Sequence, residues 1–195
     1  MSVYYLGTNY LWISFNSFVL PIQVESFASP EAKSLVLGLI AGPTIAASLL
    51  INILSGILSD HSTSRFGRRS PYILIGSLLA VPGVILTVIF PVSMLITSLS
   101  FIGVEVFTNL SCGSYQPLLA DIVPEDQRGI AGGLQGMMIL FGSALGYGVT
   151  GLLAGQGNLQ LALILIAAVL VVTTSVTLYA IKIVDRRSSR VEPFR

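Results

Sequence analysis

The sequence is poor in charge and in cysteine. Only 10% of its 195 residues are Asp, Glu, Lys or Arg, whereas 53% are hydrophobic. A soluble domain carries about 25% charged residues because its surface has to face water, so this composition excludes an ordinary soluble protein. A single cysteine, Cys112, excludes an internal disulfide. The net charge of +1 gives no reason to expect nucleic-acid binding.

The motifs of soluble enzymes are missing as well. The sequence has no Walker A loop, no cluster of metal ligands and no recognisable spacing of a nucleophile and its base. We therefore expect no enzymatic activity, no metal site and no cofactor.

Apolar residues are concentrated in six runs, each long enough to cross a bilayer as a helix of about 20 residues. They cover residues 3–24, 35–59, 72–90, 93–119, 130–154 and 159–183. No Lys or Arg precedes Lys33, so the first run lacks the positive segment of a signal peptide and is interpreted as a retained helix. The sequence predicts an all-α, six-helix membrane bundle over residues 1–184 and a tail over residues 185–195.

The cations indicate the orientation of this bundle. Lys33 is the one Lys or Arg in the connections expected on the outer side, and the other nine of the ten fall on the opposite side. These nine are Arg65, Arg68, Arg69, Arg128, Lys182, Arg186, Arg187, Arg190 and Arg195. Because Lys and Arg accumulate in cytoplasmic loops, we expect cytoplasmic termini in a plasma or inner membrane.

The connection GILSDHSTSRFGRRSP contains more than a topology signal requires. An acid adds little to such a signal, so we expect the Asp60 carboxylate to pair with Arg68 or Arg69, or with the N-terminus of a facing helix. Gly56, one turn earlier, lets a neighbouring helix approach closely, and Gly67 permits a tight turn. The alternative is that the arginines only set the topology.

Two motifs resemble the major facilitator superfamily. G-x-L-S-D followed by R-F-G-R-R, at residues 56–69, is similar to the loop between helices 2 and 3 of that family. The inserted HSTS resembles its sucrose and glycoside–cation symporter branch. In that branch, helix 4 carries an acid, an Asn one turn later and a closing LLAD, which here are Glu105, Asn109 and residues 118–121. Pro124 of the following loop also matches.

Two residues depart from this branch. Gln116 stands where the branch has Arg, and Ser114 stands where it has Pro. Both positions bear on the solute and on the coupling ion, so neither the solute nor the ion follows from the resemblance.

The resemblance implies a secondary transporter that moves a small solute, such as a sugar, by alternating access, with protons or another cation as the coupling ion. Members of the family have twelve helices in two halves, so we expect a second six-helix half, supplied by a second copy or a separate chain. The segments 56–69 and 121–128 would form a cytoplasmic gate of charges that break apart when the bundle rocks. The expected gate residues are Gly56, Asp60, Arg65, Gly67, Arg68, Arg69, Asp121 and Arg128.

Two of the predicted helices carry a polar stripe. The stripes are Tyr5, Asn9, Trp12 and Asn16 in the first helix, and Glu105, Asn109, Cys112 and Gln116 in the fourth. Steps of four, three and four place each set on one helical face. Polar groups in hydrocarbon are costly unless they are partnered or line a wet cavity, so we expect both stripes to face one cavity that forms the pathway of the solute and the proton.

Glu105 is the one acid well inside a span. Without a cation nearby, a carboxyl group in hydrocarbon tends to take a proton, so it is a candidate proton carrier. The alternative is a structural acid bonded to Asn109 or to another helix. Asn9 and Asn16 could bind solute hydroxyls and Trp12 could stack on a sugar ring, or all three could serve helix packing.

Two alternatives to a transporter remain at this point: a non-transporting membrane protein that binds or assembles partners, and an inactive fragment of a twelve-helix transporter. A cavity lined by Glu105, Asn9 and Asn16 would favour transport, whereas polar groups all satisfied between helices would favour a scaffold. Near the span ends, Tyr4, Tyr5 and Tyr72 are expected in the interfacial aromatic belt.

Overall fold

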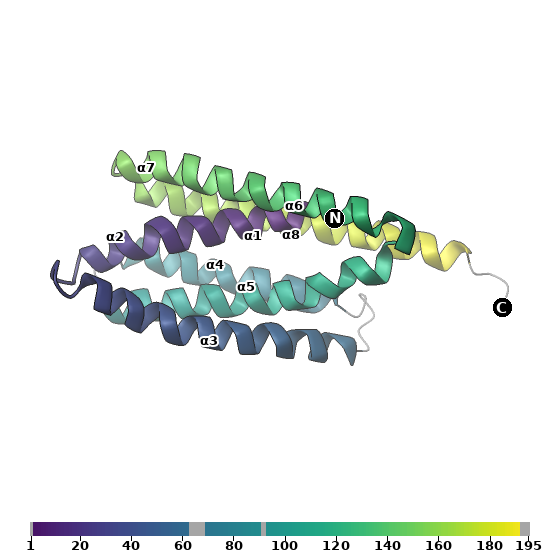
Figure 1. The fold of residues 1–195 in the computed structure, drawn as a ribbon, viewed down its shortest axis with the longest axis horizontal. Helices are drawn as coiled ribbons and strands as arrows, with labels where there is room; N and C mark the ends of the chain where they lie inside the picture. The colour runs from purple at the N-terminus through teal and green to yellow at the C-terminus, as the bar shows by residue number, and fades with distance from the viewer. Residues whose placement is uncertain (1, 63–68, 91–92, 192–195) are drawn as a thin grey trace.

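The computed structural model describes residues 2–62, 69–90 and 93–191, with the backbone alone for residues 88, 119–120 and 184–191. All regular elements in this part of the chain are helical and line up end to end into six rods (Figure 1). The rods are α1 (Val3–Ser14) with η1 (Phe15–Val19) and α2 (Leu20–Glu25); α3 (Lys33–Asp60); α4 (Ser70–Ile89); α5 (Met94–Ile122); α6 (Arg128–Leu145) with η3 (Gly146–Thr150) and α7 (Gly151–Gly155); and α8 (Leu159–Val191). A short 3₁₀ turn, η2 (Glu125–Gln127), precedes α6.

The predicted all-α membrane bundle is confirmed. Five helical stretches of the described chain are long and apolar enough to cross a membrane: Lys33–Asp60, Ser70–Thr87, Met94–Leu118, Glu125–Gly155 and Leu159–Ile183. The first rod is also helical from Val3 to Glu25, but a wide π turn at η1 divides it. Pro21 lies just beyond this turn and cannot donate a backbone hydrogen bond, which favours such a widening.

The two ends of the chain lie toward the same end of the bundle. The start of α1 and the last turns of α8 lie toward the end of the bundle at which α3 ends and α4 starts (Figure 1). This agrees with an even number of crossings. Helix α8 continues to Val191, so no break in the helix marks the expected start of the tail at residue 185. That this end faces the cytoplasm stays a prediction from the cations.

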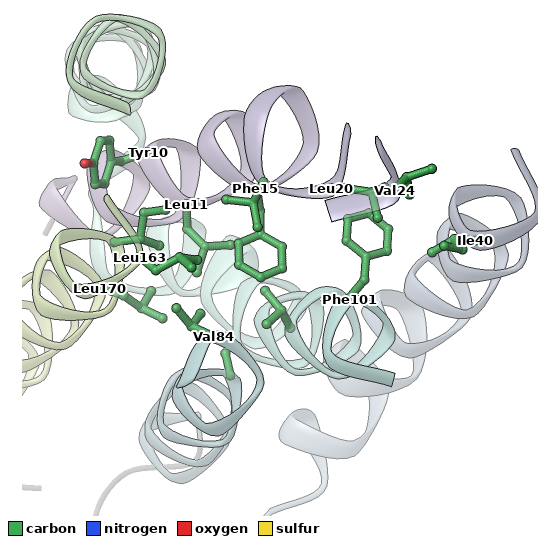
Figure 2. Close-up of a cluster of buried hydrophobic side chains, with 14 residues drawn as sticks. Tyr10, Leu11, Phe15, Leu20, Val24, Ile40, Val84, Phe101, Leu163 and Leu170 are labelled. Atoms are coloured by element: carbon green, nitrogen blue, oxygen red, sulfur yellow. The ribbon is translucent and has the colours of Figure 1, made fainter. Parts of the chain in front are cut away.

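The rods pack in an order that differs from their order in the sequence. Helix α5 packs against α3 and α4, α4 also contacts α8, and α1 packs against both α8 and α6. The helices that carry the two polar stripes, α1 and α5, therefore each have two packed neighbours. The cluster in Figure 2 lies where the first rod meets α3, α4, α5 and α8. Within it, the rings of Phe15 and Phe101 stack with their centroids 6.2 Å apart.

The expectation that Tyr4 and Tyr5 belong to an aromatic belt is wrong. Their exposed fractions are 0% and 6%, and both rings pack on Tyr115 of α5, with centroid distances of 4.5 and 5.2 Å. The Tyr4 hydroxyl donates to the Ser111 hydroxyl at 2.5 Å. A buried tyrosine is stable where its hydroxyl has a partner, and here α5 supplies it.

The close approach between α3 and α5 depends on Gly113 more than on Gly56. A Cβ on Gly56 would make an ordinary contact, 3.6 Å from the Gly113 carbonyl oxygen. A Cβ on Gly113 would overlap the Asn52 carbonyl and the Ser55 hydroxyl of α3. The missing side chain at Gly113 therefore lets the two backbones touch. The close approach expected at this crossing is present, with the critical glycine on the other helix.

Candidate functional site

A buried arginine joins three helix ends at one end of the bundle. Arg69, the residue before α4, has an exposed fraction of 5%. Its Nη2 lies 2.6 Å from the carboxylate of Asp60 at the end of α3 and 2.9 Å from that of Asp121 near the end of α5. Charge-assisted pairs of this kind are stronger than neutral hydrogen bonds. The Nε and Nη1 atoms of Arg69 have no hydrogen-bond partner among the described residues.

Of the remaining charged or glycine residues expected in the gate, the structure describes some and not others. Arg65, Gly67 and Arg68 lie outside the described residues. At the start of α6, Arg128 has its Nη1 3.4 Å from the Glu125 carboxylate, and its Nε donates to the Val123 carbonyl at 3.3 Å. The structure thus brings Asp60, Arg69 and Asp121 together and holds Arg128 on the adjoining turn.

A cavity of about 420 Å³ lies between α1, α5 and α6. It is lined by Tyr5, Asn9, Trp12, Cys112, Gln116, Gln135 and Ile139. The first five belong to the two polar stripes, so part of each stripe faces this cavity, whereas Asn16, Glu105 and Asn109 do not line it. Gln135 and Ile139 were not among the residues predicted to line it. Both residues lie on α6, and their spacing of four residues, which places them on one helical face, was the signal that could have identified them.

Glu105 lies at a cluster of three side-chain amides. Asn16 donates from Nδ2 to Glu105 Oε1 at 2.7 Å, and Asn109 donates from Nδ2 to Oε2 at 3.4 Å. Behind them, Asn52 of α3 donates from Nδ2 to Asn109 Oδ1 at 3.2 Å. The cluster therefore links η1, α5 and α3. Asn52 was also missed, because it is a single amide in an otherwise apolar part of α3 and forms no stripe.

Trp12 lies between the cavity and this cluster. Its ring lines the cavity, and its Nε1 donates to the Thr108 hydroxyl of α5 at 3.2 Å. The Asn16 amide, which contacts Glu105, also donates to the Trp12 carbonyl at 2.9 Å. The solute-sized cavity and the acid are thus adjacent but separate, and both are attached to the first rod.

These contacts bear on the alternatives left open by the sequence. Hydrogen bonds from Asn109 or from another helix were expected of a structural acid, and Glu105 receives such bonds from Asn109 and from Asn16 of the first rod. A cavity was expected of a transporter and not of a scaffold. The cavity is present and is lined by Asn9, although neither Glu105 nor Asn16 contributes to its wall. Among the residues that line it, none carries a formal charge.

Comparison with known proteins gives a consistent result. A family model described as Major Facilitator Superfamily matches residues 3–195. The general alpha-glucoside permease of Schizosaccharomyces pombe is 33% identical over 123 residues, a match that covers 55% of this chain and 22% of the permease. Sucrose transport proteins SUC4 and SUC3 of Arabidopsis thaliana are 28% and 26% identical, with 72% and 73% of this chain and 30% of each relative covered. The chain spans less than a third of the length of these relatives.

Proposed function

Because the chain belongs to the Major Facilitator Superfamily, we propose that it forms one half of a secondary transporter that moves a neutral sugar or glycoside by alternating access. The relatives that it matches carry the names of a permease and of sucrose transport proteins. The protein is a multi-pass membrane protein by its family and by its apolar helices.

The observation that carries this proposal is the chemistry of the cavity. Its volume of about 420 Å³ is within the range of roughly 300–1,000 Å³ that small-molecule sites occupy. Asn9, Gln116 and Gln135 offer amides that can donate to and accept from hydroxyls, and Trp12 offers an apolar ring face. A wall of amides and aromatic rings without formal charge suits a neutral polyhydroxy solute better than an ion.

Glu105 is the residue that we propose to carry the coupling proton. It has no ion-pair partner in the described part of the chain, and amide groups alone hold its carboxylate. Acids inside membrane spans are costly and are mostly functional. Its position beside the cavity-lining rod would let the proton and the solute affect the same helix.

The charges at the end of the bundle are proposed to form the gate. Arg69 bridges Asp60 and Asp121 and so ties α3, α4 and α5 together. Asp60 and Asp121 remain about half exposed, so water can replace the arginine when the pairs separate. Ion pairs at a wet edge can be broken and remade at modest cost.

A second six-helix half is proposed to cover the polar face. Asn16 and Gln116 are exposed in this chain, and lipid could not satisfy their amides. The matches cover only 22–30% of the relatives' own length, so each relative is long enough to contain such a second half. A second copy, a separate chain or a continuation of this chain could supply it in the same orientation, since parallel repeats are related by an axis along the membrane normal.

The lone tryptophan allows a direct test of solute binding. Trp12 is the single Trp of the sequence and lines the cavity, so its fluorescence in lipid nanodiscs reports on this site. We expect a saturable change on titration with sucrose or an α-glucoside, and none with a charged amino acid of similar size. Gln116→Leu should weaken the response, and Gln160→Leu, an exposed amide at the start of α8, should leave it unchanged. Equal responses to all solutes, or to none, would contradict the proposal.

A further inference from the structure

Asn109 is fixed in one orientation by its three hydrogen bonds. Its Nδ2 donates to the Glu105 backbone carbonyl at 2.9 Å and to the Glu105 carboxylate at 3.4 Å, and its Oδ1 accepts from Asn52 at 3.2 Å. A turned amide would place an acceptor against both oxygens of Glu105 and a donor against the donor of Asn52. Asn52 and the Glu105 backbone carbonyl therefore together set which end of Asn109 faces the acid.

The contact between α3 and α5 brings Asn52 within hydrogen-bonding distance of Asn109. Gly113 lies one turn beyond Asn109 on α5, and a side chain there would overlap the Asn52 carbonyl. The two backbones consequently touch beside the amide pair, and α3 contributes to the Glu105 cluster from behind.

Asn16 has more freedom. Its Nδ2 donates to Glu105 Oε1 at 2.7 Å and to the Trp12 carbonyl at 2.9 Å. Its Oδ1 makes no hydrogen bond to any residue that the structure describes, and the side chain is exposed. Nothing comparable to Asn52 holds this amide, so it can turn.

We propose that protonation of Glu105 is transmitted to the first rod through Asn16, because Asn52 holds Asn109 in place. An ionised carboxylate accepts at both oxygens, whereas a protonated one has to donate from one of them. A proton on Oε1 points at the NH₂ group of Asn16, so two donors face each other. Asn16 then either turns its Oδ1 toward the acid or loses its contact with Glu105. Oε2 continues to accept from Asn109.

We call this transmission from Glu105 to Asn16 the relay. In it, Asn52 is a positioning residue, and Asn16 is the contact that moves. The inference rests on the proposed function only in taking Glu105 as a group that gains and loses a proton. The signal reaches the rod that also carries Asn9 and Trp12 of the cavity wall.

The groups around the acid do not titrate themselves. The side chains that contact or support the carboxylate are the amides of Asn16, Asn109 and Asn52. The next acid along α5, Asp121, is 16 residues further on, or about 24 Å at the helical rise. Asp60 and Arg69 are at that same distant end. On the rod of Asn16, Glu25 is nine residues further on and pairs with Lys33 at 3.1 Å. Glu105 is therefore the titratable group in contact with these amides, and its substitution identifies the source of a change on acidification.

The test follows the asparagine side chains by NMR, with isotope-labelled asparagine in the whole chain in lipid nanodiscs and with signals assigned by substitution. On acidification, we expect the Asn16 amide signals to shift with one midpoint while those of Asn109 stay nearly in place. Glu105→Gln should abolish the shift. A shift at Asn109 with none at Asn16, or no shift at either, would overturn the relay.

Substitutions at Asn52 test whether this residue positions the Asn109 amide or only supports the fold. In Asn52→Leu we expect the Asn109 signals to shift with the same midpoint as those of Asn16, because their amide is no longer held. Asn52→Gln keeps a donor and should behave like the wild type, as should Asn158→Leu in the connection before α8. An Asn109 that stays fixed in Asn52→Leu would contradict the role of Asn52. A relay that is intact in a protein without proton-driven uptake would uphold this inference and contradict the proposed function alone.

Discussion

Arg69 is buried, and its Nη2 lies 2.6 Å from the carboxylate of Asp60, the last residue of α3. The arginine contacts Asp121 as well, so each acid can retain it in part when the other is removed. Asp60 is about half exposed, so solvent screens this pair. Because Asp121 keeps the buried arginine paired, we expect the loss of Asp60 to cost about 1 kcal/mol, the upper end for screened pairs. A pair of this strength is too weak to determine the fold but strong enough to bias two conformations.

The first prediction concerns this pair. Asp60→Asn should lower transport by the completed protein about fivefold, the factor that a bias of about 1 kcal/mol controls, while the amount of inserted protein stays near that of the wild type. Uptake and membrane expression would be measured together. Glu25→Gln removes the pair with Lys33, which lies outside both gate segments, and serves as control. A fall in expression in step with transport would make Asp60 structural.

The contact at Gly113 predicts a loss of stability. Gly113→Ala adds a methyl group that overlaps the Asn52 carbonyl and the Ser55 hydroxyl, and overpacking of this kind costs about 1–3 kcal/mol. Gly103→Ala, on the same helix, meets no other atom within 4 Å and should be neutral or stabilising. The midpoint of thermal unfolding in detergent would compare the two. Equal midpoints would mean that α3 and α5 do not touch at this crossing.

The buried tyrosine predicts a smaller effect. Tyr4→Phe removes the hydroxyl that donates to Ser111 but keeps the ring against Tyr115, so the expected loss of unfolding free energy is about 1 kcal/mol. Tyr179→Phe alters a side chain that is 69% exposed and should have no effect. The same unfolding assay applies. A Tyr4→Phe protein as stable as the wild type would place this tyrosine in the aromatic belt after all.

The helices and one face of the site could be predicted from the sequence, because each depends on residues close together in the chain. Apolar runs locate the helices, and the spacing of Asn9, Trp12 and Gln116 identifies the faces that meet at the cavity. An acid among arginines suggested the pairing of Asp60, although the added contact of Arg69 with Asp121 depends on how α5 packs.

The remaining features depend on which helices are neighbours. The spacing of residues within one helix does not contain this information. Asn52 joins the Glu105 cluster because Gly113 lets α3 approach α5. Gln135 reaches the cavity because α6 packs against α1. Tyr4, near the start of α1, is buried because its ring packs on Tyr115 and its hydroxyl donates a hydrogen bond to Ser111 of α5.

The most direct test of the account is proton-driven uptake through Glu105. Glu105→Gln keeps the size of the side chain and its capacity to bond with Asn16 and Asn109, but it fixes a neutral state. Proteoliposomes would contain the chain together with the same second half in wild-type and variant form. Sugar uptake would be measured with and without an imposed pH gradient, and exchange of labelled for unlabelled sugar would serve as the internal control. We expect the variant to lose gradient-driven accumulation and to retain exchange, whereas equal accumulation by both proteins would remove Glu105 from the mechanism.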